Sequence, residues 1–107
     1  MNVLMLLKPK ETVKYIYETN TLRQGLEKMR AHSYTAIPVI SEDGKYVGTV
    51  SDIIRKDFNP AVRINVSMDE LLRRAVNQNF VPVTDDWGTF IGIVTRQDII
   101  KHFIDPN

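Results

Sequence analysis

The chain has 107 residues and a mass of 12.3 kDa, which is the length of one small domain. Hydrophobic residues make up 43% and charged residues 25%, which excludes a disordered tail, a collagen-like fibre and a low-complexity linker. Lys and Arg total 14 against 13 Asp and Glu, so no broad surface charge attracts DNA or an anionic membrane. Any anion site must therefore be local.

The lack of cysteine excludes disulfides, thiolate nucleophiles and cysteine metal clusters, and it fits a reducing compartment. The apolar run Val3–Leu7 is too short for a signal sequence or a membrane span, and it predicts a short helix packed on the body of the domain. The histidines, His32 and His102, fit no metal-ligand spacing. We therefore expect a soluble cytoplasmic protein without a metal site.

The first half of the chain predicts a series of short elements. Residues 14–17 have the pattern of a strand, and Thr21 then begins a capping box that leads into a helix. Strands are expected at residues 37–40 and 47–50, where apolar and β-branched side chains are enriched. The Asp43-Gly44 pair between them is typical of a tight hairpin turn.

The second half repeats this order. Three residue pairs recur at a spacing of 44: Pro38 and Pro82, Gly44 and Gly88, and Gly48 and Gly92. A strand is expected at residues 62–66, and a second capped helix begins at Ser67. Two strands joined by a tight turn follow at residues 81–83 and 90–94, and a final helix is expected at residues 97–103. Identical residue types at so many equally spaced positions indicate an internal repeat.

Each repeat therefore has the order β-α-β-β-α, with the first unit at residues 12–58 and the second at 59–107. A unit of about 45 residues is too small to bury an adequate core by itself. The two units must pack together into one domain, which we expect to have pseudo-two-fold symmetry. Helices and strands mixed within each unit make the fold class α+β.

One stretch, from Gly92 to Asp98, has the residue types of an anion site. Thr95 places a hydroxyl at the end of a strand, and Asp98 lies in the first turn of the following helix. Backbone N–H groups at such a helix start attract phosphate, Arg96 adds positive charge, and the Asp98 carboxylate can accept two hydrogen bonds from a ribose. The alternative is an ordinary helix cap, which the local pattern by itself favours.

These features together resemble a tandem CBS domain pair, also called a Bateman module. The resemblance rests on the two Pro-Val strands, the paired glycines and the stretch 92–98, and it covers residues 12–103. It is closest to small stand-alone bacterial CBS-pair proteins. It implies that an adenosine-containing ligand binds between the units: AMP, ADP, ATP, S-adenosylmethionine or cyclic di-AMP.

The resemblance also implies roles for particular residues. Thr95 would contact the phosphate, with Arg96 nearby, and Asp98 would hold the ribose. The residues expected to face the base or to help hold the phosphate are Tyr34, Thr35, Ala36 and Thr12. A weaker second site would use Asn79, Phe80, Val81 and Ser51.

The first unit departs from the family pattern after Ser51. Asp52 follows this residue at once, whereas the family pattern places the aspartate three residues later, and Asn59-Pro60 ends any helix soon afterwards. Either the helix here is minimal, or residues between Ser51 and Asp52 are missing from the sequence. We favour the second explanation, which predicts an intact mass clearly above 12.3 kDa; a measured mass equal to this value would refute it.

The function expected from this resemblance is non-enzymatic sensing. The module would bind an adenine nucleotide and signal its occupancy to a partner protein, and the family leads us to expect a homodimer. The alternative is a structural or dimerisation module that binds no nucleotide. An enzyme is not expected, because no nucleophile, base and orienting group can be assembled from the sequence. We expect no binding to DNA or to a membrane.

Overall fold

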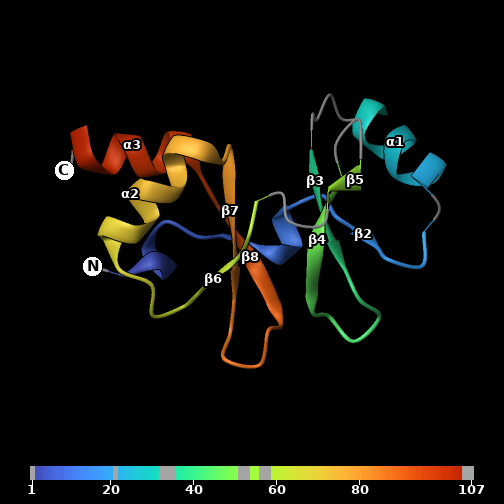
Figure 1. Ribbon diagram of the computed structural model, residues 1–107, viewed down its shortest axis with the longest axis horizontal. Helices are drawn as coiled ribbons and strands as arrows, with labels where there is room; N and C mark the ends of the chain where they lie inside the picture. Colours follow the sequence, from blue (N-terminus) through green and yellow to red (C-terminus); the bar gives the residue numbers. More distant parts are fainter. Residues whose placement is uncertain (1, 21, 32–35, 51–53, 56–58, 105–107) are drawn as a thin grey trace.

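The computed structural model describes residues 2–20, 22–31, 36–50, 54–55 and 59–104. Two four-stranded sheets lie next to each other, and helices cover the outer side of each (Figure 1). Each sheet is built mainly from one repeat. The α+β fold expected from the sequence is confirmed, with two sheets and three α-helices within the described residues.

The second unit contains β6 (Val62–Arg63), α2 (Met68–Asn77), β7 (Phe80–Thr84), β8 (Phe90–Thr95) and α3 (Arg96–Ile104). Strand β6 pairs in parallel with β7, and β7 pairs antiparallel with β8. The backbone N–H of Glu70 donates to Ser67 Oγ at 3.1 Å, which is the predicted N-cap of α2. The order expected for this unit is confirmed.

The first unit contains β2 (Ile16–Tyr17), α1 (Leu22–Ala31), β3 (Ile37–Ile40), β4 (Tyr46–Val50) and β5 (Ile54–Arg55). These strands form a sheet in the order β2-β3-β4-β5, with β2 parallel to β3 and the other neighbours antiparallel. The predicted cap of α1, Thr21, lies outside the described residues.

The end of the first unit differs from the sequence-based expectation of a helix. Ile54–Arg55 form β5, which folds back antiparallel on β4, so that its backbone groups find partners in the sheet. Asn59 follows with a left-handed φ of 60°, and Pro60 cannot continue a helix. Residues 51–53 and 56–58 lie outside the described part of the chain.

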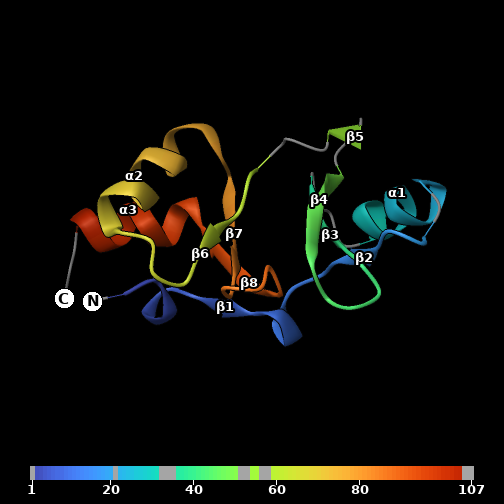
Figure 2. The ribbon, with the colours of Figure 1, turned by 60° about the horizontal axis from the view of Figure 1, so that its bottom comes forward.

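The first residues of the chain pack on the second unit, not on the first. They form the 3₁₀ turns η1 (Val3–Met5) and η2 (Lys10–Thr12) with strand β1 (Lys8–Pro9) between them. Strand β1 pairs antiparallel with β8 and completes the second sheet. From there the chain crosses to β2 in the first sheet (Figure 2). The short N-terminal helix predicted from the sequence is present as η1, and it buries Val3 completely.

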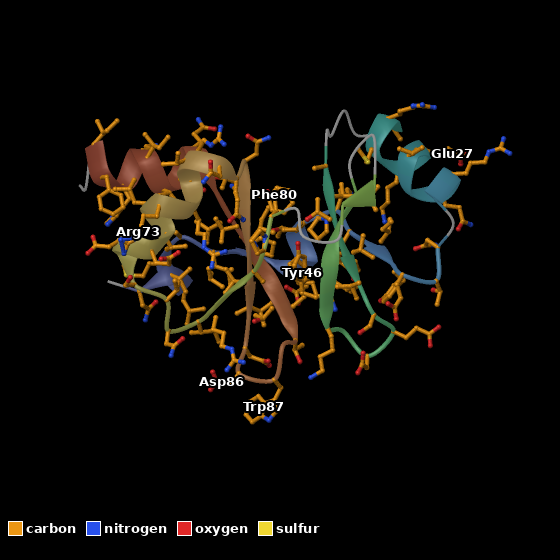
Figure 3. All side chains as sticks on the ribbon, in the orientation of Figure 1. Glu27, Tyr46, Arg73, Phe80, Asp86 and Trp87 are labelled. Carbon is orange, nitrogen blue, oxygen red and sulfur yellow. The ribbon has the colours of Figure 1, made fainter. Side chains whose placement is uncertain are left out.

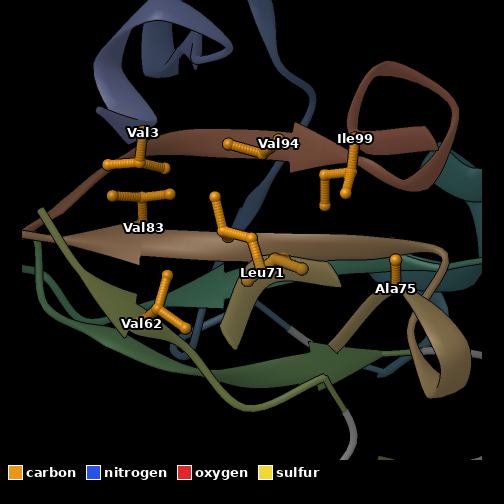
Figure 4. Close-up of a cluster of buried hydrophobic side chains, with 8 residues drawn as sticks. Val3, Val62, Leu71, Ala75, Val83, Val94 and Ile99 are labelled. Atoms are coloured by element: carbon orange, nitrogen blue, oxygen red, sulfur yellow. The ribbon is translucent and has the colours of Figure 1, made fainter. Parts of the chain in front are cut away.

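The larger hydrophobic core lies in the second unit, between its sheet, helices α2 and α3, and η1 (Figure 4). Its buried members are Val3, Val62, Leu71, Ala75, Val81, Val83, Val94 and Ile99. A smaller cluster in the first unit consists of Ile16, Met29, Ile37 and Val50. Among the described residues, more of the buried apolar side chains lie in the second unit than in the first, so most of the buried apolar surface described belongs to the second unit.

The two units join at their hairpin turns. The Tyr46 N–H donates to the Gly88 carbonyl at 3.1 Å, and the Phe90 N–H donates to the Gly44 carbonyl at 2.8 Å. The rings of Tyr46 and Phe90 stack with their centroids 6.1 Å apart. Tyr46 and Phe90 have the same 44-residue spacing as the repeated glycines, as do Gly44 and Gly88. This reciprocal pairing is the contact expected at a pseudo-two-fold axis.

Burial raises the pKa of Tyr46 to about 12, and its hydroxyl donates to the Asn59 carbonyl at 2.8 Å. The neutral phenol therefore stabilises the fold fully below pH 10, and this contribution is lost as the pH rises from about 10 to about 12. In Tyr46→Phe, the free energy of unfolding should depend less steeply on pH in that window than in the native protein. Urea denaturation at several alkaline pH values measures the difference, and identical slopes would contradict it.

Candidate functional site

A cavity of about 480 Å³ lies between the two units. Its walls come from the linker after β1, the start of β3, the start of β7 and strand β8. The lining residues are Lys8, Thr12, Val13, Lys14, Ala36, Ile37, Pro38, Asn79, Phe80, Ile93 and Thr95. The volume is in the range of small-molecule sites, which is about 300–1,000 Å³.

The fold explains why these distant segments meet. Strands β3 and β7 are the two repeated Pro-Val strands, so the pseudo-symmetry brings their starts together. The register of β1 on β8 places Lys8 opposite Ile93. Ile37 and Phe80 are buried and supply an apolar wall, and Figure 3 shows Phe80 between the two sheets. An apolar wall with a polar rim is typical of a ligand pocket.

Thr95 caps α3 and also lines the cavity. It ends β8, and its Oγ1 accepts the backbone N–H of Asp98 at 3.2 Å, which makes it the cap of α3. A hydroxyl oxygen that accepts still carries a hydrogen to donate, and within the described residues this hydrogen has no acceptor. Thr95 also lines the cavity, so capping the helix and donating to a ligand are compatible.

Asp98 and Arg96, predicted beside Thr95, are not among the residues that line this cavity. The Asp98 carboxylate lies 3.6 Å from Lys8 Nζ and borders an adjacent shallower hollow. The Arg96 N–H donates to the Asn79 carbonyl at 2.9 Å, and its Nε donates to the Gln78 carbonyl at 3.2 Å. The Arg96 side chain is therefore tied to the turn that precedes β7.

Two more residues expected at the first site do line the cavity: Thr12 and Ala36. The Thr12 hydroxyl donates to the Pro9 carbonyl at 2.8 Å, so its hydrogen is already used within η2. Tyr34 and Thr35, expected at the base, lie outside the described residues.

The residues expected at a second, weaker site are divided by the structure. Asn79 and Phe80 line the same cavity as Thr95. Val81 is fully buried in the core of the second unit, because alternate strand residues face opposite sides of the sheet. Ser51 lies outside the described residues.

Sequence reasoning missed two lysines at the rim of the cavity, Lys8 and Lys14. They flank the η2 turn, where the sequence shows a short basic run, Lys8-Pro9-Lys10, followed by Lys14. That run was the available signal. Its meaning depends on the pairing of β1 with β8, which joins residues more than eighty positions apart.

The turn aspartates stabilise the hairpins. Burial of the Asp85 carboxyl would raise its pKa, but hydrogen bonds from the backbone N–H groups of Thr89 and Trp87, each 2.9 Å long, hold it below its usual value. Within the described ranges, no three His, Asp or Glu side chains come together as a metal-binding group. None of the helices described is long and apolar enough to cross a bilayer.

The two repeated units with a cavity between them define the class of protein to which this chain belongs. The CBS domain family matches residues 7–53 and 50–105, nearly the entire chain, so the protein belongs to the CBS domain family as a tandem pair.

Several known proteins are similar to this chain. The uncharacterized protein MJ1426 of Methanocaldococcus jannaschii is 25% identical over 142 aligned residues, covering 83% of this chain and 84% of the relative. Because this alignment is longer than the chain, the relative holds residues that this chain lacks.

Solved structures share the fold. A CBS domain-containing protein of unknown function from Bacillus anthracis matches with a TM-score of 0.88 at 21% identity, over 100% of this chain and 95% of its own. CbpB of Listeria monocytogenes in complex with c-di-AMP matches with a TM-score of 0.84 at 22% identity, over 95% of this chain and 94% of its own. CBSX2 in complex with AMP matches with a TM-score of 0.84 at 19% identity, over 98% of this chain and 97% of its own.

Proposed function

We propose that this protein is a non-catalytic regulatory module that binds an adenine nucleotide between its two CBS units and signals occupancy to a partner protein. The observation that carries the proposal is the cavity between the units, in which Thr95 presents a hydroxyl hydrogen without an acceptor in the described residues. The AMP and c-di-AMP complexes of proteins with the same fold support it.

The chemistry of the walls matches the parts of an adenine nucleotide. The apolar wall made by Ile37, Pro38 and Phe80 suits a flat base, which is poorly hydrated on its faces. A phosphate oxygen can accept the free hydrogen of Thr95 at the rim. Asp98 can reach a ribose only if its ion pair with Lys8 opens, since its carboxylate lies outside the cavity lining.

The position of the cavity supports a signalling role. A ligand there contacts both units and the linker between them, so it favours the arrangement of the units that binds it better. The readout surface would be a homodimer or an effector protein. Helices α2 and α3 expose apolar side chains that suit such an interface: Leu72, Val76, Ile100, Phe103 and Ile104.

The alternative, a structural or dimerisation module without a ligand, is favoured by that same exposed apolar face. The two functions differ in a calorimetric titration with AMP, ATP, S-adenosylmethionine and c-di-AMP. The regulatory module binds at least one of these. Binding of none of them would leave the dimerisation module as the function.

The site is tested by two substitutions at one position. Thr95→Ala removes the hydroxyl and should weaken nucleotide binding about tenfold, because a hydrogen bond to a charged phosphate is lost. Thr95→Ser keeps the hydroxyl and should bind nearly as the native protein does. Thr95→Ala also removes the cap of α3, which costs about 1 kcal/mol, so thermal unfolding of both variants is measured alongside. Equal affinities for the two variants would refute the assignment of Thr95.

A further inference from the structure

The rim of the cavity carries charge of one sign. Lys8 and Lys14 line it, and no carboxylate does so within the described residues. Lys14 is exposed and forms no ion pair in that part of the chain, so its ammonium group is available to a ligand. Lys8 has one carboxylate partner, Asp98, at 3.6 Å, and its side chain remains 51% exposed. Exposed ion pairs of this kind contribute little energy, so a phosphate can compete for Lys8.

The backbone at the start of α3 offers less to an anion than the sequence suggests. The N–H of Arg96 already donates to the Asn79 carbonyl, and the N–H of Asp98 already donates to Thr95 Oγ1. The Arg96 Nε is held by the Gln78 carbonyl, and this side chain does not line the cavity. The Thr12 hydroxyl donates to Pro9. A phosphate therefore has to find its positive charge in the lysines.

We infer that Lys8 and Lys14 are the phosphate-binding cations of this cavity, and that it selects adenosine ligands with a negatively charged phosphate. This inference rests on the proposed function and narrows it. Uncharged adenosine gains nothing from the two ammonium groups. S-adenosylmethionine carries a sulfonium, an ammonium and a carboxylate, so its net charge is positive and the two lysines repel it. AMP, ADP, ATP and cyclic di-AMP remain as the ligand class.

The test compares ligands that share adenosine and differ in charge. Calorimetry with AMP, adenosine and S-adenosylmethionine is run on the native protein at fixed ionic strength. AMP should bind about tenfold more tightly than adenosine, as expected for a charge-assisted hydrogen bond, and S-adenosylmethionine should bind more weakly than adenosine. Added salt should weaken AMP binding and leave adenosine binding nearly unchanged.

The residue assignment is tested with a matched pair of variants. Lys14→Gln should weaken AMP binding about tenfold and leave adenosine binding unchanged. Lys10→Gln removes the same charge from the same segment, but Lys10 Nζ lies 5.3 Å from the centre of the Tyr15 ring and does not line the cavity. Its AMP affinity should change less than about twofold, since the lost charge is distant and screened by salt.

The outcomes separate this inference from the proposed function. If adenosine and AMP bind equally, or if S-adenosylmethionine binds as tightly as AMP, charge selection is wrong while adenosine binding stands. Equal effects of Lys14→Gln and Lys10→Gln overturn the role of Lys14. If neither these three ligands nor ATP and c-di-AMP bind, the proposed function fails, and the inference fails with it.

Discussion

Replacing Gly92 with alanine is expected to separate strand β1 from β8 and to destabilise the protein by about 3 kcal/mol, the upper part of the usual cost of overpacking. A Cβ at this position would lie 2.2 Å from the Lys8 carbonyl oxygen and 2.9 Å from Leu7 Cδ1. The first contact is with backbone, which a side-chain rotation cannot relieve. The glycine also has a φ of +156°, which side chains rarely adopt.

Gly25→Ala is the matched control, because its new Cβ would lie in ordinary contact with Val50 Cγ1, at 3.9 Å, and close to only the end of the Ile16 side chain, at 2.9 Å. That side chain can move, and alanine favours helix α1 by up to about 1 kcal/mol over glycine. Urea denaturation should therefore show a large loss for Gly92→Ala and little change for Gly25→Ala. AMP affinity should also fall in Gly92→Ala, since displaced β1 carries Lys8 away from the cavity. Equal stability of the two variants would refute the proposed packing of β1.

Leu71→Ala should have the second large effect. Leu71 lies on α2 with no exposed surface, among the core side chains of the second unit. Removing a buried leucine side chain leaves a cavity and costs about 2–5 kcal/mol. This is a large part of the stability of a small domain, typically about 5–15 kcal/mol.

The next residue provides the control. Leu72 follows on the same helix and is 39% exposed, so Leu72→Ala should cost less than about 1 kcal/mol. Chemical denaturation of both variants measures the difference. A similar loss for the two would mean that α2 does not face the sheet as described.

Local patterns predicted much of the fold from the sequence. The capping box at Ser67 and the apolar spacing after it specify α2, because both act within a few residues. The turn glycines, Gly44 and Gly88, have φ of +88° and +83°, a conformation that glycine adopts without strain. The repeated spacing of these residues also predicted two units packed with pseudo-two-fold symmetry, whereas the hydrogen bonds between their hairpins emerged only from the structure.

The rest depends on contacts between distant residues. Nothing near Lys8 in the sequence shows that it pairs opposite Ile93, yet this pairing places Lys8 at the cavity. Similarly, Asn79 and Phe80 were assigned to a separate site because they lie in the second repeat, whereas the pseudo-symmetry turns the start of that strand toward the first unit. The backbone N–H of Arg96 looked available because its acceptor, the Asn79 carbonyl, lies in the turn before β7, distant in the sequence.

At β5, the sequence predicted a helix where the structure has a strand. The resemblance to the family predicted a helix after Ser51. The relative aligned with this chain holds residues that the chain lacks, so an element expected from the family need not form here, and Ile54–Arg55 form a strand. With little chain before Pro60, the backbone at Ile54–Arg55 satisfies its hydrogen bonds by pairing with β4.

The measurement that tests the central claim most directly is a crystal structure of the protein grown with saturating AMP. The nucleotide should lie in the cavity between the units, with its phosphate within hydrogen-bond distance of Thr95 Oγ1 and Lys14 Nζ and its base against Phe80. AMP bound at another surface, or a cavity that remains empty at saturating AMP, would contradict the claim.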